Sequence, residues 1–590
     1  MVHFTGLDYF WVIAYIVLTI GSGVIFYRLG KRSSADFFLA GRGLPWWLPA
    51  TSNFATHTAT DTPMWFSGWV YRSGMYGLWG SLFAGWCAIS AWVSTRIFRR
   101  SLAGTQAEWQ TLRFSGLPAE LMRGWMAGWQ VVLNMFVAGW VGIAMGNVCQ
   151  WAFGWPLWYG LVIFSSICCI YAMTSGFWGV IIADVQQGIT MLLTIVLVSV
   201  WAAIAAGGPK AIVVKIHALN RPEMLNPFHL TGFASGDYSF LWLLTLIVVP
   251  FFGGFGMATH FDWFVEAQRV QSAKSVKAAS YSIWWGAATV IVRNAIWMVA
   301  VLAFFVLNPD ITDSNQYQLA WFRMGFEYFP SGLVGFFFAA ILAIHFSTIS
   351  GILNLGAMYG ARDLYHHYIN PKASEKQIIR VGRIMTVVIM LGSFFFGMMI
   401  GKDVSQWLFF ALWLMIAGTW LPNILQVIWW RFNGWGYLSA WIANLGICWL
   451  VVWILPAFHV LPELKDFQQF WILMGAVALI YFPVTFLTKP DDMDRLVKIY
   501  VQTRPIGFWG PVRREAERRG LLAKMEEIEL KAERVATHQM GAEGKRKSAK
   551  SEKKKNKGSA ARTEKRPVKK TVKMKGTGRK ASKTAERRRS

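Results

Sequence analysis

Long apolar runs constrain this sequence more than any other feature. A helix needs about 20 apolar residues to cross the hydrocarbon core of a bilayer, because each residue advances the helix by about 1.5 Å. Runs of this kind fall at residues 10–29, 45–71, 76–97, 124–148, 156–175, 178–206, 240–262, 283–307, 331–361, 381–400, 404–430, 435–457 and 467–488. The sequence therefore predicts an all-α polytopic membrane protein with about 13 transmembrane helices.

Composition supports a membrane location. Charged residues make up 15% of the chain, whereas a soluble protein carries about 25%. The net charge of +27 comes mostly from residues 541–590, which hold 21 Lys and Arg against 4 Glu. We expect this basic tail to be disordered and to contact anionic lipid, and we expect no specific nucleic acid as a partner.

The charges in the loops predict an orientation, because cytoplasmic loops carry an excess of Lys and Arg. With the N-terminus outside, the inside loops hold Lys31, Arg32, Arg42, Arg99, Arg100, Arg113, Arg123, Arg269, Lys274, Lys277, Arg362, Lys372, Lys376, Arg380 and Arg383. An odd number of crossings then places the C-terminus and its basic tail in the cytoplasm.

The second apolar run contains polar residues that a continuous membrane helix does not accommodate. Residues 51–63 include six Thr or Ser, with His57 and Asp61 shortly before Pro63. An ionisable group at the bilayer centre costs at least about 2.5–3.5 kcal/mol. Broken helices at the midplane bind cations and substrates in transporters, and we expect a break here. The alternative is a kinked helix whose Thr hydroxyls bond back to its own carbonyls.

A second interruption is predicted five runs later. Residues 251–257 contain three Gly and are followed by His260 and Asp262. Gly clusters alone favour close helix packing. Their position is more informative, because inverted five-helix repeats carry their two broken helices at corresponding places.

Further polar groups lie deep in apolar runs, namely Asp184, Arg293 and His345. Ser347 and Thr348 follow His345 as adjacent hydroxyls on an apolar helix. Facing a broken helix, such hydroxyls would form a site for a hard monovalent cation. Bonding of these hydroxyls back to the preceding turn is the alternative.

Enzymatic activity is not expected. The intramembrane polar residues form no metal-ligand, nucleophile–base or phosphate-loop pattern. The five cysteines lie in apolar runs and show no metal or disulfide spacing. No cofactor is therefore expected.

Several motifs resemble the sodium:solute symporter family over roughly residues 8–515. In chain order they are Phe37-Phe-Leu-Ala-Gly-Arg42 with Leu44-Pro-Trp-Trp47, the stretch 176–188, Gln268-Arg269 with Ser272-Ala-Lys274, and Phe346-Ser-Thr-Ile-Ser350 through Arg362-Asp-Leu-Tyr365, continued by residues 373–376 and Gly382-Arg383. Each motif alone is weak, but their common order makes the resemblance specific.

The resemblance implies the inverted-repeat fold of the leucine transporter, a 5+5 arrangement with discontinuous first and sixth core helices. The implied organisation is an extra transmembrane helix and cytoplasmic loop (1–44), a first five-helix repeat (45–206), an external loop (207–239), a second five-helix repeat (240–430), two C-terminal transmembrane helices (431–489), a cytoplasmic amphipathic segment (490–540) and the basic tail (541–590).

The resemblance also implies a sodium site between the first and eighth core helices. By position, its ligands would be the carbonyls of Ala55, Thr58 and Ile344 and the hydroxyls of Ser347 and Thr348. Asp184 matches an Asp along the family's inner sodium exit route.

The implied substrate positions depart from those of sugar symporters. Gly80 falls where those proteins have a Glu, and Asp262 and Trp263 stand near the expected Asn and Tyr. A different pocket is therefore expected, with candidate residues His57, Asp61, Trp65, Asp262, Trp263, Arg293 and Gln426. Arg293 either faces a substrate carboxylate or pairs with Asp61 or Asp262.

The predicted function is sodium-coupled symport of a small polar solute, either a sugar, an amino acid or a carboxylate, by alternating access. The family resemblance and the short loops favour the inner (plasma) membrane of a bacterium. Proton coupling through His57, Asp61 or His345 is one alternative. A sensor built on a transporter scaffold is another.

Overall fold

The structure, a computed structural model, describes residues 2–30, 32–233, 238–260, 266–400, 415–460 and 464–523. The chain divides into two compact units, Met1–Ala516 and Glu517–Ser590. The described part of the second unit is residues 517–523, so the architecture below is that of the first unit. The basic tail predicted at 541–590 lies outside the described residues.

The described part of the first unit consists of helices and the loops that connect them, with isolated β-bridges but no strand. The helices are α1 (Gly6–Gly30), α2 (Ser34–Leu39), α3 (Trp47–Thr56), α4 (Asp61–Ser73), α5 (Leu78–Ser81), α6 (Phe83–Ser101), α7 (Gln106–Arg113), α8 (Gly116–Phe153), α9 (Leu157–Tyr159), α10 (Ser165–Ala205), α11 (Pro209–Ala218), α12 (Phe240–His260), α13 (Glu266–Ser272), α14 (Val276–Leu307), α15 (Ser314–Gln318), α16 (Ala320–Tyr328), α17 (Val334–Met358), α18 (Glu375–Ile400), α20 (Met415–Ile428), α21 (Gly434–Trp449), α22 (Leu455–Ala457), α23 (Asp466–Leu487), α24 (Met493–Thr503) and α25 (Gly510–Arg518).

The length and composition of several helices show that they could span a membrane. Among the described residues, seven helical stretches are long and apolar enough to cross a bilayer, and the shorter stretches Gly6–Gly21 and Phe240–Phe252 are also apolar. The prediction of an all-α polytopic membrane protein is thereby confirmed. The count of about 13 crossings stays a prediction.

Two of the predicted spans, 156–175 and 178–206, join without a loop. Gly176 separates them inside α10, with φ 60° and ψ −153°. A Cβ at this position would lie 2.6 Å from the Phe37 carbonyl oxygen. Glycine is therefore required here both for the backbone conformation and for the close approach of the chain.

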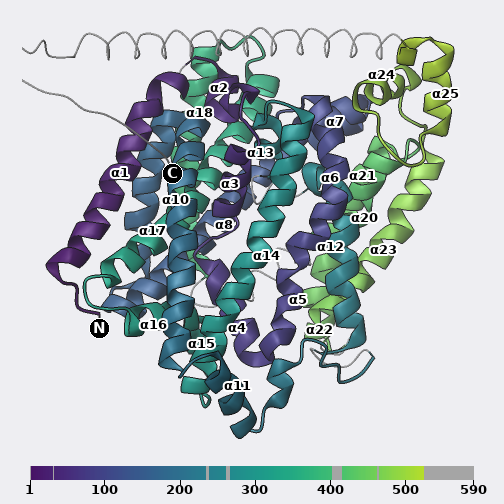
Figure 1. The fold of residues 1–590 in the computed structure, drawn as a ribbon. Helices are drawn as coiled ribbons and strands as arrows, with labels where there is room; N and C mark the ends of the chain where they lie inside the picture. Colours follow the sequence, from purple (N-terminus) through teal and green to yellow (C-terminus); the bar gives the residue numbers. More distant parts are fainter. Residues whose placement is uncertain are drawn as a thin grey trace, which may run out of the picture. The chain divides into compact units, whose positions relative to one another are not determined.

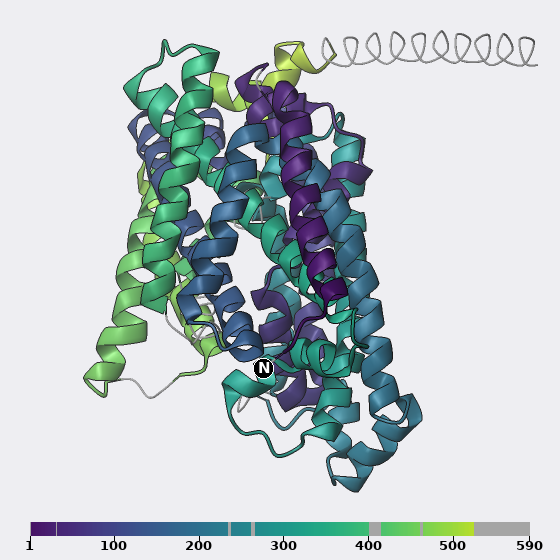
Figure 2. The same cartoon turned by 90° about the vertical axis from the view of Figure 1, so that its left-hand side faces the viewer.

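Helix α17 forms the centre of the bundle, since all but one of its 25 residues are buried. It packs against α8, α10 and α18. Figures 1 and 2 show α1 at one edge of the bundle, beside α10, and α21 and α23 toward the opposite edge. The predicted cation-site hydroxyls thus lie on the most enclosed helix.

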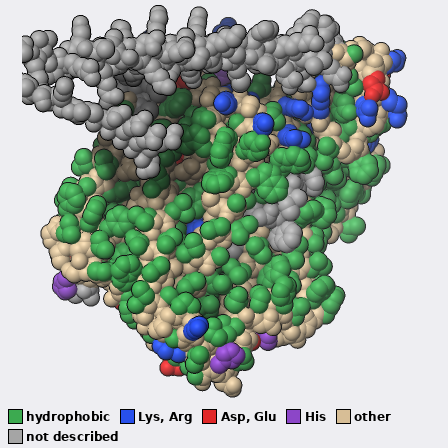
Figure 3. All heavy atoms as spheres, viewed as in Figure 1, with side chains coloured by type: hydrophobic (Ala, Val, Ile, Leu, Met, Phe, Trp, Pro, Cys, Tyr) green, Lys and Arg blue, Asp and Glu red, His purple; other side chains and the backbone are tan. Residues whose placement is uncertain are grey.

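The surface of the first unit follows the membrane pattern. On the face shown in Figure 3, hydrophobic side chains cover the middle, whereas Lys and Arg side chains gather toward the upper edge. Large apolar side chains such as Leu391, Phe395 and Met398 of α18 are more than half exposed. A bilayer is the solvent that such a surface fits.

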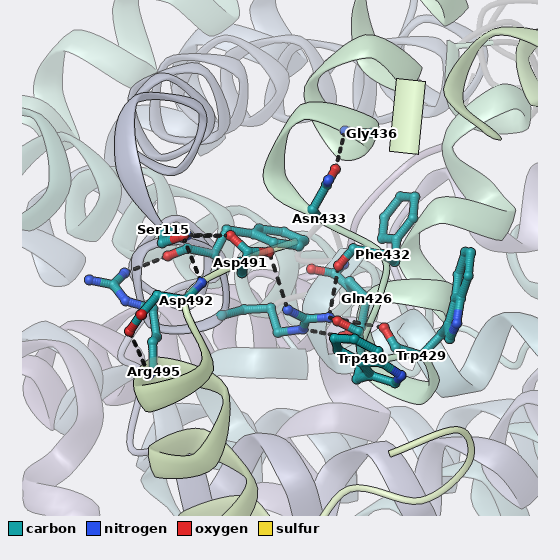
Figure 4. Close-up of polar contacts among 12 residues, drawn as sticks. Ser115, Gln426, Trp429, Trp430, Phe432, Asn433, Gly436, Asp491, Asp492 and Arg495 are labelled. Atoms are coloured by element: carbon teal, nitrogen blue, oxygen red, sulfur yellow. Dashed lines mark hydrogen bonds and ion pairs between the residues drawn. The ribbon is translucent and has the colours of Figure 1, made fainter. Parts of the chain in front are cut away.

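The C-terminal end of α20 is held by a residue that lies far away in the sequence. A helix leaves its last four carbonyls without a partner inside the helix. Arg113 Nε donates to the Gln426 carbonyl at 2.7 Å, and Arg113 Nη2 donates to the carbonyls of Trp429 and Phe432 at 3.0 Å each. Figure 4 shows these acceptors together. One guanidinium from α7 therefore caps the helix end.

The segment after α24 supplies the remaining donors. Trp509 Nε1 donates to the Val427 carbonyl at 2.9 Å, and the Phe508 N–H donates to the Ile428 carbonyl at 2.6 Å. Four successive carbonyls from 426 to 429 thus have donors outside α20. Phe508 and Trp509 of the cytoplasmic segment predicted at 490–540 thus bond to the end of α20.

Arg113 also forms a buried ion pair with Asp491. Its Nη1 lies 3.7 Å from Asp491 Oδ2, and neither side chain is more than 3% exposed. Burial lowers the pKa of the Arg113 guanidinium to about 10, so the side chain remains charged at neutral pH. Asp491 also accepts from the backbone N–H and the hydroxyl of Ser115 (Figure 4).

We predict that Arg113→Met strongly destabilises the protein. The substitution leaves the charge of Asp491 without its Arg113 partner and removes the Arg113 donors from several carbonyls, and breaking a buried ion pair by removing one partner costs about 3–5 kcal/mol. The thermal unfolding midpoint of the purified protein in detergent should fall clearly. Arg514→Met, which removes an exposed Arg of α25, is the matched control. Equal midpoints for the two variants would contradict the capping role.

Candidate functional site

The second apolar run folds as two helices separated by a short irregular segment. Helix α3 ends at Thr56 and α4 begins at Asp61. Within the break, the Ala59 N–H donates to Thr62 Oγ1 at 3.1 Å, a side-chain bond that competes with helix continuation. Pro63 lies in the first turn of α4, where its missing N–H has no helical acceptor to lose. The predicted break in the first core helix is confirmed.

The described residues include both sides of the second predicted break. Helix α12 ends at His260 and α13 begins at Glu266. Asp262 and Trp263 lie outside the described residues. Their proposed substrate contacts therefore stay a prediction.

Helix α17 brings its two hydroxyls to the end of α3. Thr348 Oγ1 donates to the Thr56 carbonyl at 3.0 Å and lies 3.4 Å from the Ile344 carbonyl. Ser347 Oγ donates to Asp184 Oδ1 at 2.7 Å. All these residues are buried. Simple back-bonding does not describe the two hydroxyls, because each has a partner on another helix.

Ala55 and Thr58 bracket the same position on the broken helix. The Ala55 carbonyl accepts from the Thr58 N–H at 3.1 Å, and Thr58 Oγ1 donates to the Phe54 carbonyl at 2.8 Å. Thr56, which binds Thr348, lies between them. The five residues predicted for sodium therefore lie on two elements that meet at Thr56 and Thr348.

Asp184 is surrounded by donors from three other helices. Besides Ser347, it accepts from Ser52 of α3 and forms an ion pair with Arg269 of α13, with Nη2 3.2 Å from Oδ2. Arg269 Nε donates to Ser52 Oγ at 2.7 Å, and its Nη2 donates to Thr56 Oγ1. Arg269 and Asp184 are both buried.

Sequence reasoning missed this role of Arg269. The loop charges predict a cytoplasmic loop for this residue, because a single Arg among loop charges carries no sign of burial. The Gln268-Arg269 motif was the available signal. In the structure Gln268 is buried as well, and its Nε2 donates to the Phe38 carbonyl and to Asn354 Oδ1 at 2.7 Å each.

Arg293 of α14 holds the break from another side. Its Nη1 donates to the His57 carbonyl at 2.7 Å and to Thr58 Oγ1 at 2.6 Å, and its Nε donates to Asn294 Oδ1 at 2.8 Å. The guanidinium also lies over the Trp297 ring, 4.6 Å from its centroid. These bonds stabilise the irregular backbone, a role that the sequence did not suggest.

Asp61 differs from the other buried charges. It is 7% exposed, and its Oδ1 has no hydrogen-bond partner in the structure. The N-terminus of a helix stabilises a carboxylate by about 0.3–1 kcal/mol, whereas an ionised group in the bilayer centre costs at least about 2.5–3.5 kcal/mol. The position of Asp61 at the start of α4 thus offsets only part of the free-energy cost of placing an ionised carboxylate in the membrane.

Two other candidates are placed near the break. Trp65 lies one turn after Asp61 on α4 and is partly exposed, with its ring 6.1 Å from the Trp69 ring. His345 of α17 is buried, with Nδ1 3.3 Å from Thr60 Oγ1 in the break and Nε2 3.5 Å from Ser165 Oγ. Residues 57–60 are therefore contacted from α14 and α17.

Gln426 takes part in a polar network at the end of α20. Its Oε1 accepts from Trp109 Nε1 at 3.0 Å, its Nε2 donates to Asn423 at 3.2 Å, and its carbonyl accepts from Arg113. The side chain thus belongs to the network at the end of α20 (Figure 4). The position of Gln426 on the tenth core helix does not by itself tell whether the side chain contacts a substrate or takes part in this network.

Gly80 has a steric explanation. A Cβ at this position would overlap the ring of Trp69. The indole therefore fills the space in front of α5 in which the aligned Glu of sugar symporters would begin. No group of His, Cys, Asp or Glu suited to a metal ion occurs among the described residues, and the candidate cation ligands are hydroxyls and carbonyls.

Comparison with known proteins agrees with this geometry. The osmoregulated proline transporter OpuE of Bacillus subtilis is 25% identical over 313 residues, which span 53% of this chain and 60% of that protein. The sodium/glucose cotransporter of Vibrio parahaemolyticus is 22% identical over 413 residues, 64% of this chain and 72% of the relative. A substrate-bound, outward-open sodium-coupled sialic acid symporter has a similar fold, with a TM-score of 0.69 at 19% identity over 83% of this chain and 100% of that one.

The family is shown by a longer match. The family model of the sodium:solute symporters matches residues 37–444, a range that includes the break, α17 and the Asp184 cluster. The chain therefore belongs to the sodium:solute symporter family and is a sodium-coupled membrane transporter, not an enzyme.

Proposed function

We propose that this protein carries a small polar organic solute, either a sugar, an amino acid or a carboxylate, across the membrane together with sodium by alternating access. The bond between Thr348 Oγ1 and the Thr56 carbonyl carries the proposal. It joins α17 to the end of α3 at the point where backbone carbonyls leave the helix. Such discontinuities bind ions and substrates in transporters of this architecture.

The proposed sodium ligands are the carbonyls of Ala55, Thr58 and Ile344 and the hydroxyls of Ser347 and Thr348. Sodium is a hard cation, and oxygen atoms of this kind suit it. An ion between α3 and α17 would hold the two helices together. Sodium binding would thus favour the state in which the solute site beside the break is formed.

Asp184 and Arg269 are proposed to close the inner exit. The guanidinium bridges Asp184, Ser52 and Thr56 directly beside Ser347. A cation leaving past Asp184 must therefore wait until Arg269 moves. Opening of the inner side would break the pair, and closing would restore it.

The proposed solute contacts are His57, Asp61, Trp65 and Arg293, with Asp262 and Trp263 from the second break. His57 lies in the irregular segment after α3, Asp61 and Trp65 lie at the start of α4, and Arg293 donates to the His57 carbonyl. Gln426 is left out of this site because its side chain is engaged by Trp109 and Asn423.

The proposed location is a plasma membrane, with the N-terminus outside and the C-terminus in the cytoplasm. The charge distribution of the loops supports this orientation, and so does the larger gathering of Lys and Arg side chains at the upper edge than at the lower edge in Figure 3. The basic tail is proposed to contact anionic lipid.

We predict that Ser347→Ala/Thr348→Ala abolishes sodium-dependent uptake into proteoliposomes and binding of ²²Na⁺ by the purified protein. The variant removes two of the five proposed oxygen ligands. Thr386→Ala/Ser393→Ala is the matched control, because these buried hydroxyls of α18 bond back to their own helix. The control should bind ²²Na⁺ like the wild type. Uptake driven by a proton gradient and indifferent to sodium would refute sodium coupling.

We further predict that Asp184 and Arg269 are energetically coupled. Asp184→Asn and Arg269→Gln should each lower the thermal unfolding midpoint, because each leaves a buried charge unpaired. The double variant should lose less than the sum, with a coupling of about 0.5–3 kcal/mol. Arg323→Gln and Glu327→Gln form the control pair, since this ion pair of α16 is partly exposed. Additive effects at Asp184 and Arg269 would argue against the proposed gate.

A further inference from the structure

Three arginines from different parts of the sequence form a cluster at one end of the bundle. Arg42 ends the 3₁₀ turn Ala40–Arg42 before α3, Arg99 lies in the last turn of α6, and Arg362 lies in the π-helix Tyr359–Ile369 that continues α17. Arg99 is 9% exposed, and the other two are partly buried. Figure 1 shows α2, α7 and α13, the elements around this arginine cluster, toward the same end of the bundle.

Hydrogen bonds fix two of the arginines beside α13. Arg42 Nη2 donates to the Leu102 carbonyl at 2.8 Å, just after α6, and Arg42 Nη1 donates to the side chain of Gln271 in α13. Arg99 Nε donates to the Ala273 carbonyl at 3.0 Å. Arg42 and Arg99 are therefore both tied to the C-terminal end of α13.

Arg362 reaches the same loop that follows α6. Its Nη1 lies 2.5 Å from the position that a Cβ of residue 104 would occupy, so a side chain in place of Gly104 would displace the guanidinium. Its Nη2 lies 3.5 Å from Glu108 Oε2, and the same oxygen accepts from the Gly104 N–H at 2.7 Å. Arg42 interacts electrostatically with both Arg99 and Arg362, so the three guanidiniums share one electrostatic environment.

The carboxylates around the cluster do not balance its positive charge. Glu108 interacts with both Arg42 and Arg362, so one negative charge is shared by two guanidiniums. No carboxylate of the described residues pairs with Arg99. Burial, together with the like charges of Arg99 and Arg362, lowers the pKa of the Arg42 guanidinium to about 10, and the side chain therefore stays charged at neutral pH.

Two further carboxylates interact with Arg362 but are engaged elsewhere. Asp363 is paired with Arg123, whose Nη2 lies 2.9 Å from Asp363 Oδ1. Glu375 accepts from the Ser34 N–H at the start of α2. Positive charge therefore remains in excess where the three guanidiniums meet, and excess charge in a partly buried place is costly unless an opposite charge joins it.

We propose that the arginine cluster binds a phosphoryl anion, either soluble phosphate or the headgroup of an anionic phospholipid. Guanidinium forks match the oxygens of a phosphoryl group with paired, charge-assisted hydrogen bonds. Clusters of Arg are a recurrent means by which proteins recognise such groups. The orientation proposed above places this site on the cytoplasmic side, where both sources of the group occur.

The number of guanidiniums favours a phosphoryl group over simpler anions. A chloride ion offers one spherical acceptor, which makes no use of the planar forks. A carboxylate offers two oxygens and one negative charge. A phosphoryl group offers at least three oxygen atoms in different directions, so it can accept from Arg42, Arg99 and Arg362 at once.

A bound phosphoryl group would join parts of the bundle that are far apart in the sequence. It would connect the segment before α3 with the end of α6 and with the continuation of α17. Because the anion binds the folded protein and screens the repulsion among the three guanidiniums, it should raise the thermal unfolding midpoint.

The test uses the full-length protein, purified in detergent and washed free of bound lipid. Potassium phosphate is compared with potassium chloride at equal ionic strength, because chloride reports charge screening alone. The midpoint at each concentration gives the apparent affinity. A second arm compares nanodiscs of phosphatidylcholine with nanodiscs that also contain phosphatidylglycerol, and it distinguishes the lipid source from the soluble one.

In the wild type, phosphate should raise the midpoint more than chloride does, or phosphatidylglycerol should raise it more than phosphatidylcholine alone. Arg99→Gln and Arg362→Gln should each weaken the apparent affinity about tenfold or more, as expected for loss of a charge-assisted hydrogen bond. Arg99→Lys should retain part of the response, because the charge remains but the fork is lost. Arg514→Gln, which changes an exposed Arg of α25, is the matched control and should behave like the wild type.

Glu108→Gln gives a result that general destabilisation of the fold cannot produce. The amide keeps an oxygen that can accept from the Gly104 N–H, but it removes the negative charge beside Arg362 and Arg42. The apparent affinity for the phosphoryl anion should therefore rise above that of the wild type.

Three results would overturn the inference. One is a midpoint that is equal in phosphate and chloride and also equal in the two kinds of nanodisc. Another is wild-type affinity in both Arg99→Gln and Arg362→Gln, which would place the binding elsewhere, for example on the basic tail. The third is an affinity of Glu108→Gln that does not exceed that of the wild type.

Discussion

The interruption between α3 and α4 is the constraint on which the rest of this structure depends. In a bilayer, backbone groups freed from a helix find no water and must be satisfied by protein. Here the donors come from several directions. Thr348 of α17 donates to the Thr56 carbonyl, and Arg293 of α14 donates to the His57 carbonyl. The break is therefore a junction between helices that are far apart in the sequence.

The same junction explains the distribution of charge in the bundle. Arg293 lies at the carbonyl end of α3, and Asp61 opens α4, so each charge lies beside the helix end of opposite polarity. Along the preceding turns of α3, Arg269 and Asp184 bind one another and the serine and threonine hydroxyls of that helix. Polar groups that would each be costly in lipid thus share partners. This sharing also means that movement of one helix alters the partners of the others.

Much of this site could be predicted from the sequence. Ionisable residues and a proline in an apolar run are rare enough that His57, Asp61 and Pro63 indicated the break. Adjacent hydroxyls at Ser347 and Thr348 indicated the helix that faces it. These features are local, and local sequence expresses them directly. The pairing of Arg269 with Asp184 joins residues that are far apart in the sequence. Nothing in the sequence around Arg269 distinguishes a buried Arg that pairs with an Asp from an Arg in an exposed loop.

The C-terminal part of the bundle shows the same limit. Gln426 has the residue type of a substrate contact, but its partners Trp109 and Arg113 come from α7, more than 300 positions away. Residues 508 and 509 were assigned to an amphipathic cytoplasmic segment by their hydropathy. Their backbone and indole donors, which hydropathy does not measure, complete the end of α20.

That cap has a consequence for biosynthesis. Phe508 and Trp509 leave the ribosome only after α20, α21 and α23 have all been made, so the carbonyls at the end of α20 wait for them during translation. Until then α20 cannot reach its final hydrogen-bonded state. Arg113 is made before α20 and already serves the carbonyls of Gln426 and Trp429. Only the carbonyls of Val427 and Ile428 depend on donors that are synthesised after the last transmembrane helix.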